Sequence, residues 1–500
     1  MLRQIIRMAG ILLSAVLLSF CFPSGGLWWL AWIAFVPFII VVRRLDWKVS
    51  FRAGYLAGFL FFALTLFWIH HVTWIGLLLL SAYLALYWAV FACAVSSSAT
   101  WTLARRVLFL SAVWAAGEYV RAQAFTGFGW ASLAHTQSNN ILLIQFSDIT
   151  GTYGVSFVLM AFNVVAAEWV ARKGRVDVRG RRAAWAVILG MALLLAYGMG
   201  RLSAPSSTSR VRVALVQGNI SLADYADPNL KDYVVERHLA LSRQALAYKP
   251  DLILWPETSF PQFIWDHPEL FEKVRAFARE HHVKLMLGAV TRSGEQYFNT
   301  AILMNGSGET KGMYSKQHLV ILGEYIPFRR QLPWLARFVP IDDFSPGVSQ
   351  VLLDAGDQRP FAALICFEDT IPALARAAVN GGAGFLVNIT NDGWFGASRQ
   401  PAMHLDNAVF RAVENRVSLL RATNTGVSCG ILPTGEITGC VADGSGPRIL
   451  AEGVSVVDVP SGPPQMTFYR KFGDIFAMLC FAVILSLMLT TKFIRENKDV

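Results

Sequence analysis

The sequence predicts a polytopic α-helical membrane domain with one α/β domain inserted near its C-terminal end. Long apolar runs fill residues 1–204 and return only in 467–500, and such runs are typical of transmembrane helices. Between them, residues 205–466 alternate short apolar strands with amphipathic helices, which is the pattern of an α/β domain. We therefore expect about seven transmembrane helices in 1–204, an extracytoplasmic α/β domain in 205–466, and a C-terminal transmembrane helix with a cytoplasmic tail in 467–500.

The composition supports a membrane protein and argues against several kinds of site. Of the 500 residues, 54% are hydrophobic and only 16% are charged. The net charge of +10 does not indicate nucleic-acid binding, because the basic residues cluster beside the apolar runs, where they control topology. No pair among the six cysteines has metal-ligand spacing. We expect no metal, no cofactor and no nucleic acid, and a monomer because no pattern indicates a dimer.

The candidate spans follow one another through the N-terminal part, and one more lies near the C-terminus. Several are shorter than the roughly 20 residues of a straight span, so their limits are approximate. Glu118 interrupts one of them. The runs are Ile5–Phe22, Leu27–Val42, Ala53–Ile69, Trp74–Val95, Val107–Val120, Gly154–Val170, Ala183–Gly200 and Phe472–Thr490.

Lysine and arginine residues set the expected orientation. If every candidate run crosses the membrane, the basic segments fall on one side, which the positive-inside rule makes cytoplasmic, and the α/β domain lies on the other. Arg470 and Lys471 oppose the rule, but long basic side chains at a span end can reach the interface. The basic segments are 3–7, 43–52, 105–106, 172–182 and 492–498.

Two interpretations of the membrane domain remain open. A transport site usually shows ionisable residues or broken helices at the midplane, and only Glu118 fits, with Arg121 one turn later to pair with it. The favoured alternative is a scaffold that anchors the α/β domain and shapes a lipid-facing cleft. The glycine-rich, aromatic loop Thr126–Trp130 either touches the α/β domain at the interface or belongs to an aromatic belt.

Residues 211–441 predict a succession of strands and helices. The turn at Asn305–Gly308 joins an antiparallel strand pair. Asn380–Gly384 is glycine-rich, but it ends a helix and begins a strand, which predicts a turn rather than a phosphate loop. The expected strands are Val211–Val216, Asp251–Trp255, Val283–Val290, Phe298–Met304, Thr310–Tyr314, Val348–Leu353, Phe361–Ile365, Phe385–Ile389, Ser418–Ala422, Val427–Leu432 and Glu436–Val441. The expected helices are Tyr233–Ala247, Glu269–His281, Ile371–Val379 and Ala402–Asn415.

Two cysteines flank a predicted hairpin turn at Pro433–Gly435. Outside the cytoplasm, Cys429 and Cys440 could form a disulfide. The alternative is a pair of unrelated thiols, because the sequence does not fix the distance between them.

Cys366 is the strongest single candidate for chemistry. It lies between the apolar strand Phe361–Ile365 and a helix that begins near Pro372. Backbone N–H groups and the positive end of a helix dipole at such a position favour a thiolate. The alternative is a buried structural cysteine, since free cysteine is often buried.

Two other polar residues follow strand ends in the same way. Glu257 comes after the strand that Pro256 ends, at the rim where α/β proteins place their sites. Lys316 follows the strand Thr310–Tyr314. Each signal is weak alone, and Glu257 by itself reads as a surface carboxylate, but the ordered set of glutamate, lysine and cysteine is specific.

This ordered set resembles the nitrilase superfamily and its Glu-Lys-Cys triad. The match continues in Asn388–Gly396, which contains Trp394, and in Arg411–Arg416, and it covers roughly Val211 to Val456. A nitrilase-like domain held between membrane spans is similar to one branch, the apolipoprotein N-acyltransferase family. Two positions depart from that family. Gly129 stands where proline is common, and Phe367 stands where some members carry tyrosine.

The resemblance implies an αββα sandwich, a multi-pass location in the bacterial inner membrane with the catalytic domain on the periplasmic side, and ping-pong acyl transfer. The donor would be a phospholipid, typically phosphatidylethanolamine, and the acceptor the α-amine of a diacylglyceryl-cysteine at the N-terminus of an apolipoprotein. Cys366 would be the nucleophile, Glu257 the general base and Lys316 the stabiliser of the oxyanion.

The same resemblance points to supporting residues around the triad. Glu324 would orient Lys316 and Glu368 would order the Cys366 turn, although both could equally form plain structural ion pairs. Phe367 and Trp394 lie in the matching motifs and are further supporting candidates.

An apolar segment supports a lipid substrate independently of the resemblance. Leu319–Pro346 is long, rich in aliphatic and aromatic residues, and interleaved with Arg329, Arg330 and Arg337. Above a membrane it would form a lid that dips into the interface. Phe260, Phe263, Ile264 and Trp265 would form a second such edge. The alternative is that these residues pack on the core of their own domain.

Two other functions are alternatives: the first uses the same triad, and the second does not. A membrane-tethered amidase or nitrilase would end with water attacking the thioester, but a soluble amide requires neither a multi-span anchor nor an apolar lid. A transporter or assembly factor with an inert domain would leave the complete triad unexplained.

Overall fold

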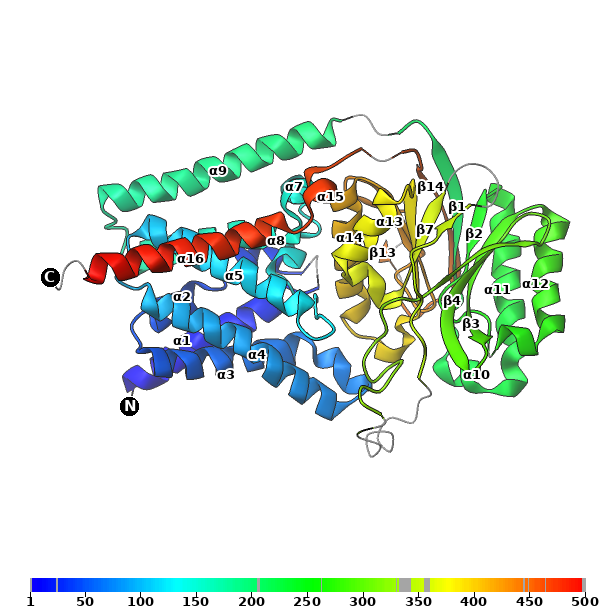
Figure 1. Ribbon diagram of the computed structural model, residues 1–500, viewed down its shortest axis with the longest axis horizontal. Coiled ribbons are helices and arrows are strands. Elements are labelled where there is room, and N and C mark those ends of the chain that lie inside the picture. Colours follow the sequence, from blue (N-terminus) through cyan, green and yellow to red (C-terminus); the bar gives the residue numbers. More distant parts are fainter. Residues whose placement is uncertain are drawn as a thin grey trace. The chain divides into compact units, whose positions relative to one another are not determined.

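The computed structural model describes residues 2–23, 26–204, 207–261, 263–329, 331, 343–354, 360–443, 446–447, 449–463 and 465–496. Contacts divide the chain into two compact units (Figure 1). The helical unit comprises Met1–Ala204 and Thr467–Val500, and the α/β unit comprises Pro205–Met466.

The helical unit consists of long helices joined by short helical turns. Asp46 caps one long helix by accepting hydrogen bonds from the N–H groups of Lys48 and Val49, so that helix begins earlier than its apolar run. The long helices are α1 (Leu2–Ser19), α3 (Trp47–Thr65), α4 (Trp74–Ser97), α5 (Leu103–Gln123), α8 (Thr152–Ala171), α9 (Val178–Leu202) and α16 (Ile475–Glu496). The short elements are η1 (Trp28–Trp32), α2 (Val36–Val42), η2 (Phe67–His71), η3 (Leu133–Gln137), α6 (Ile141–Ile144), α7 (Ser147–Thr150) and α15 (Phe468–Phe472).

The helices match the apolar runs only in part. Among the described residues, three helices, α4, α8 and α9, are long and apolar enough to cross a membrane. Two predicted spans are divided: Leu27–Val42 becomes η1 and α2, because a proline begins a new helix, and Ala53–Ile69 becomes α3 and η2. The predicted run from Phe472 starts in α15, and α16 begins only at Ile475.

Buried polar groups tie the helical unit together. Glu168 on α8 binds three arginines, with 2.7 Å between its Oε2 and Nη1 of Arg106 and 2.9 Å to Nη1 of Arg43; Arg172 is the third. Glu118 accepts hydrogen bonds from the Trp114 indole and the Leu133 N–H. These contacts hold loops and helices to one another.

The loop before η3 folds into the helical unit. Arg121 donates hydrogen bonds to the carbonyl of Trp130 at 2.6 Å and to the hydroxyl of Ser132 at 3.0 Å. Trp130 is buried and packs on Trp68, with 5.3 Å between ring centroids. Gly127 has φ of +76°, and a Cβ there would lie 2.3 Å from the carbonyl oxygen of Ala122, so only glycine fits.

The α/β unit contains two six-stranded sheets. The first has the order β14-β1-β2-β3-β4-β5, with β1, β2 and β3 parallel and the outer pairs antiparallel. Its strands are β1 (Arg210–Gln217), β2 (Leu252–Leu254), β3 (Lys284–Ser293), β4 (Gln296–Met304), β5 (Thr310–Ser315) and β14 (Gly453–Pro460). The second has the order β11-β10-β9-β8-β7-β6, with β7, β8 and β9 parallel. Its strands are β6 (Leu352–Leu353), β7 (Phe361–Ile365), β8 (Phe385–Thr390), β9 (Ser418–Thr423), β10 (Cys429–Ile431) and β11 (Ile437–Thr438).

The two sheets pack face to face and helices cover their outer sides, as the predicted αββα sandwich requires. One core lies between the sheets and unites side chains such as Leu215, Leu254, Ile365 and Leu420. A second core joins the first sheet to α11 (Lys231–Ala245) and α12 (Pro268–His281). The helices α13 (Pro372–Asn380) and α14 (Gln400–Asn415) pack on the second sheet (Figure 1).

The fold differs from the expected elements at the sheet edges. The sequence interpretation missed β14 and the short pair β12 (Ala442–Asp443) and β13 (Gly446–Pro447). The expected strand Val348–Leu353 shrinks to the two residues of β6. Cys429 and Cys440 are both free thiols in the structure, so they do not form the disulfide that was one of the two alternatives.

Candidate active site

The Cys366 turn presents the thiol at the end of β7. Cys366 has φ of +52°, a left-handed conformation that L-residues rarely adopt, and the turn η8 (Cys366–Thr370) follows directly. Asn388 on β8 secures the turn by donating a hydrogen bond to the carbonyl of Cys366 at 3.0 Å.

The structure does not favour the thiolate form of Cys366 that the sequence predicted. The sequence predicted a helix start beside Cys366, but a five-residue 3-10 turn intervenes before α13 begins at Pro372. Burial raises the pKa of the Cys366 thiol well above its usual value, and the charge of Glu257 raises it further, while Lys316 opposes the rise. These surroundings favour the neutral thiol over the thiolate, so Cys366 would require a base to act as a nucleophile.

Glu257 lies in a buried position directly after β2. Its Oε1 accepts a hydrogen bond from the Asn299 amide at 2.7 Å, and its Oε2 accepts one from the Asn391 N–H at 2.9 Å. Burial raises the pKa of the Glu257 carboxyl, and Glu324 adds to the rise although Lys316 opposes it. A carboxylate whose pKa is raised in this way is suited to take up a proton.

A glycine on β3 makes room for Glu257. A Cβ at Gly288 would lie 2.6 Å from the carbonyl oxygen of Pro256 and 2.7 Å from the Cα of Glu257. Gly288 also donates its N–H to Pro256. This close approach fixes the backbone that carries the carboxylate.

Lys316 lies directly after β5 and is only 1% exposed. Its Nζ is 2.8 Å from Oε1 of Glu324 and 3.6 Å from Oε1 of Glu257. Burial alone would lower the pKa of Lys316, but Glu324 and Glu257 more than reverse this and raise it, so the ammonium stays charged. The structure thus gathers Glu257, Lys316 and Glu324, and the charges of Glu257 and Lys316 act on the Cys366 thiol.

Glu368 joins the Lys316 segment to the Cys366 turn by hydrogen bonds rather than by an ion pair. One carboxylate oxygen accepts from the N–H groups of Gln317 at 2.7 Å and His318 at 3.1 Å. The other accepts from the N–H of Ile365 at 2.8 Å and from the Tyr314 hydroxyl at 2.9 Å. Burial raises the pKa of Glu368 to about 6.

The two aromatic candidates occupy different environments. Phe367 stacks on the ring of His318, with 5.7 Å between centroids. Trp394 is 59% exposed in η9 (Asp392–Phe395), so its ring lies at the surface. Within the motif that contains Trp394, Asn391 contacts Glu257 by donating its backbone N–H to the carboxylate.

Asn299 is a site residue that the sequence interpretation missed. Its amide nitrogen donates to Glu257 at 2.7 Å and to Glu324 at 3.0 Å, so one side chain spaces two carboxylates. The only signal in the sequence is an amide residue in the strand β4, which also carries the polar residues Gln296 and Thr300.

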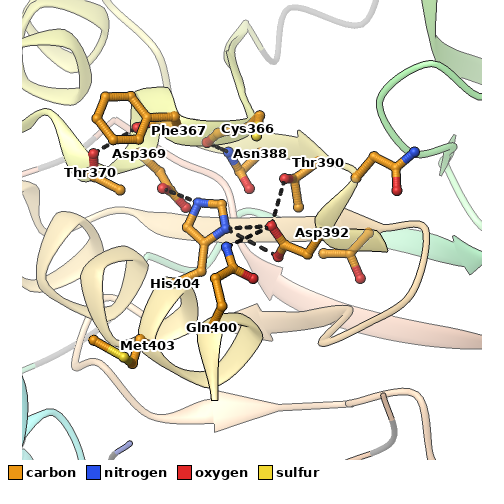
Figure 2. A network of polar contacts seen from close by, with 12 residues as sticks. Cys366, Phe367, Asp369, Thr370, Asn388, Thr390, Asp392, Gln400, Met403 and His404 are labelled. Carbon is orange, nitrogen blue, oxygen red and sulfur yellow. Dashed lines mark hydrogen bonds and ion pairs between the residues drawn. The ribbon is translucent and has the colours of Figure 1, made fainter. Parts of the chain in front are cut away.

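A buried charged cluster behind the Cys366 turn was also missed. It consists of Asp369, Asp392, His404 and Arg421, and we call it the His404 cluster. All four side chains are at most 1% exposed. Figure 2 shows the His404 ring between the carboxylates of Asp369 and Asp392, with Gln400 beside the latter.

The apolar segment expected to form a lid is described only at its two ends. The described ends mix buried and exposed side chains: Ile326 is buried, whereas Phe328 is 71% exposed, and Arg329 binds Asp343 through two nitrogens at 2.8 and 2.9 Å. Outside the described residues lie Arg330, Trp334, Leu335, Arg337, Phe338 and Val339.

Two of the four residues of the expected second edge belong to the core. Phe260 and Ile264 are fully buried in the layer between the first sheet and its helices, because the chain turns inward after β2. Phe263 stacks on Tyr297, and Trp265 remains 46% exposed. In the described part of the chain, no group of three His, Cys, Asp or Glu side chains is placed to hold a metal ion.

Family models and known proteins match both parts of the chain. Residues 14–165 match the apolipoprotein N-acyltransferase N-terminal domain, and residues 212–461 match the carbon-nitrogen hydrolase family. An apolipoprotein N-acyltransferase of Geobacter metallireducens is 39% identical over 97% of this chain and 96% of its own. One from Chlorobaculum tepidum is 29% identical over 94% of each chain. Among solved structures, an amidase from Nesterenkonia sp. covers 54% of this chain and 95% of its own, at 21% identity and a TM-score of 0.38.

Proposed function

Because the chain belongs to the apolipoprotein N-acyltransferase family, an acyltransferase family of lipoprotein maturation, we propose that it completes maturation through a covalent cysteine intermediate. The acyl chain passes from a membrane phospholipid, in the first instance phosphatidylethanolamine, to a thioester on Cys366. From there it passes to the α-amine of the diacylglyceryl-cysteine at the N-terminus of an apolipoprotein.

One observation carries the proposal. Buried Glu257 and Lys316 lie 3.6 Å apart, between Oε1 and Nζ, and the charges of both act on the Cys366 thiol. A proton acceptor, a fixed cation and a thiol in one place are the parts that nucleophilic acyl transfer requires.

The first half-reaction forms the thioester. Glu257 takes the proton of the Cys366 thiol as the sulfur attacks the ester carbonyl of the phospholipid. Lys316 and the backbone N–H of Phe367 stabilise the tetrahedral oxyanion. The ester C–O bond then breaks, and Glu257 returns the proton to the departing lysophospholipid alcohol.

The second half-reaction transfers the acyl chain. The neutral α-amine of the acceptor attacks the thioester carbonyl, and Glu257 takes a proton from the attacking nitrogen. The C–S bond breaks, and the proton returns to the Cys366 sulfur. The products are an amide on the lipoprotein and the restored thiol, so no cofactor is consumed.

The location of the substrates agrees with a membrane protein. Apolar helices and the family's N-terminal domain precede the α/β unit. We propose a monomer that crosses the inner membrane several times, with the α/β unit on the periplasmic side, as the distribution of basic residues predicts. Donor and acceptor are then both lipids anchored in the membrane that holds the enzyme.

Intact mass spectrometry tests the covalent step. The purified protein is incubated with a diacyl phospholipid and no acceptor, beside Cys366→Ser. We expect the wild type alone to gain the mass of one acyl chain, and neutral hydroxylamine to release it, because thioesters are labile to that reagent. A diacylglyceryl-cysteine peptide should then discharge the adduct.

Other outcomes point to other functions. Steady hydrolysis of small amides without an adduct would make the tethered amidase the better interpretation. An adduct that persists in Cys366→Ser would contradict the assignment of the nucleophile. Full lipoprotein maturation by Cys366→Ala would contradict any role of the thiol.

A further inference from the structure

The His404 cluster lies directly behind the proposed nucleophile and takes no part in the two half-reactions. Asp369 belongs to the Cys366 turn η8, Asp392 begins η9, His404 lies on α14 and Arg421 lies on β9. Ion pairs between these side chains therefore join four elements of the second sheet and its helices. Figure 2 shows the part formed by Asp369, Asp392 and His404.

The geometry fixes the charge of His404. Its Nε2 lies 2.8 Å from Oδ1 of Asp369, and its Nδ1 lies 3.1 Å from both oxygens of Asp392. Ionised carboxylates only accept hydrogen bonds, so both ring nitrogens must carry protons. Burial alone would lower the pKa of His404, but Asp369 and Asp392 raise it to about 9.

The cluster is balanced when His404 is charged. Arg421 forms the second bridge: its Nη1 binds Asp369, and its Nη2 lies 3.7 Å from Oδ2 of Asp392. Two cations then face two carboxylates in a buried space. The neighbouring helix α13 also packs on α14, and its one charged residue is Arg376.

The cluster reaches the thiol through one hydroxyl. The Thr390 hydroxyl donates a hydrogen bond to Oδ1 of Asp392 at 3.5 Å. The Thr390 side chain also lowers the pKa of the Cys366 thiol, which favours the thiolate. A threonine hydroxyl has a single proton to donate. When His404 and Gln400 satisfy Asp392, that proton is available to the sulfur.

We propose that His404 is a positioning residue for the Cys366 nucleophile: its imidazolium joins Asp369 of the Cys366 turn to Asp392 and thereby directs the Thr390 hydroxyl at the sulfur. The inference rests on the proposed function only in taking Cys366 as the nucleophile. Loss of the imidazolium charge leaves Asp392 undercompensated beside the thiol and draws the Thr390 proton toward the carboxylate. Both effects disfavour the thiolate.

The rate of Cys366 alkylation tests this without any lipid. The full-length protein is treated with iodoacetamide over a range of pH, and the Cys366 peptide is followed by mass spectrometry. We expect His404→Gln to slow alkylation at pH 8 about ten-fold, as an increase of roughly one pKa unit would, and to move the pH midpoint upward. His238→Gln is the matched control, because His238 is fully buried on α11 but neutral: burial lowers its pKa to about 4.

A charge-balanced variant separates charge from shape. Asp392→Asn/His404→Gln leaves one carboxylate facing one arginine, and we expect its alkylation midpoint to return toward that of the wild type. An unchanged midpoint in folded His404→Gln, or no recovery in the double variant, would overturn the proposal. If His404→Gln does not fold, Thr390→Val carries the test, since it keeps the cluster and removes only the hydroxyl; an unchanged rate there would also overturn it.

The outcome is independent of the acyl-transfer proposal. A shifted midpoint without any acyl adduct on the wild type would retain the role of His404 and reject the function. An adduct that forms equally fast on wild type and His404→Gln, with equal midpoints, would reject the role of His404 and retain the function.

Discussion

At the scale of single residues, burial acts in the same direction on the proposed base and on the proposed nucleophile. Both Glu257 and the Cys366 thiol have raised pKa values because both are buried. Lys316 keeps its charge between them and opposes both increases. In the proposed mechanism, the proton would pass from the Cys366 sulfur to the Glu257 carboxylate within this group of interacting charges, without a change in bulk pH.

Replacing Glu257 by glutamine tests the base. The amide keeps an oxygen that can accept the Asn391 N–H, but it cannot take a proton, so we expect thioester formation to slow by about 10²- to 10⁴-fold. The alkylation midpoint of Cys366 should move the other way, downward, because the Glu257 charge no longer raises the pKa of the thiol. Rapid-quench intact mass and iodoacetamide titration measure the two effects.

The matched control is Glu272→Gln on the surface of α12, where the carboxylate binds only Arg275 and Arg279. This variant should change neither the rate of thioester formation nor the alkylation midpoint of Cys366. Unimpaired thioester formation in Glu257→Gln would remove Glu257 from the mechanism.

At the scale of elements, Glu368 makes two strand ends into one rigid platform. Its carboxylate accepts N–H groups from the segment after β5 and from the end of β7, so the lysine and the cysteine are placed by the same side chain. The expected alternative of a structural ion pair does not describe these contacts, which are hydrogen bonds from backbone and hydroxyl groups.

The raised pKa of Glu368 predicts a pH-dependent stability. The difference between about 6 in the folded state and the ordinary 4.5 corresponds to about 2 kcal/mol. The pKa of Glu368 is higher in the folded state than in the unfolded state. Its contribution to the free energy of unfolding is therefore fully present below pH 4.5 and is lost as the pH rises through 6. Glu368→Gln cannot titrate, so we expect a shallower change of Tm between these limits.

The same variant should also be less stable at pH 7. Glutamine offers one accepting oxygen where the carboxylate offers two, and its NH₂ group faces donors, which costs roughly 1–3 kcal/mol. Thermal melts of the full-length protein at pH 4.5 and 7, beside exposed Glu280→Gln, check both effects. A Tm profile parallel to that of the wild type would show that Glu368 does not titrate in this range.

Strand ends explain which part of the site could be predicted from sequence. Glu257 and Cys366 each follow an apolar strand, and Lys316 follows the strand Thr310–Tyr314. Each signal was weak alone, and the ordered set of the three residues selected them as candidates. Asn299 and His404 gave no such pattern, because their importance depends on which strands and helices become neighbours. Thr390 follows the expected strand Phe385–Ile389, but it was not singled out. Likewise β14 pairs with β1 across more than half of the unit's length, and local alternation alone did not indicate it.

At the scale of the whole molecule, the surface of the helical unit agrees with a membrane protein. Large apolar side chains of α9 point outward, with Trp185 68%, Leu189 61% and Leu193 62% exposed. Such an apolar surface on a long helix is unfavourable in water, whereas it is favourable in contact with lipid. The exposed face of α9 is therefore suited to contact with lipid, which supports the proposed location in a membrane.

The last prediction concerns the orientation of the protein in the membrane, and it follows from the distribution of basic residues. The segment between α8 and α9 carries Arg172, Lys173 and Arg175, and such loops are retained in the cytoplasm. α9 then crosses once, so a fusion of alkaline phosphatase after Ser203 should be active in living cells, whereas fusions after Lys173 and Glu496 should be inactive. Green fluorescent protein at the same points should give the reverse pattern, because it fluoresces only when it folds in the cytoplasm. Phosphatase activity after Lys173 would place the α/β unit in the cytoplasm, away from the diacylglyceryl-cysteine of exported apolipoproteins, and would contradict the proposed acceptor together with the topology.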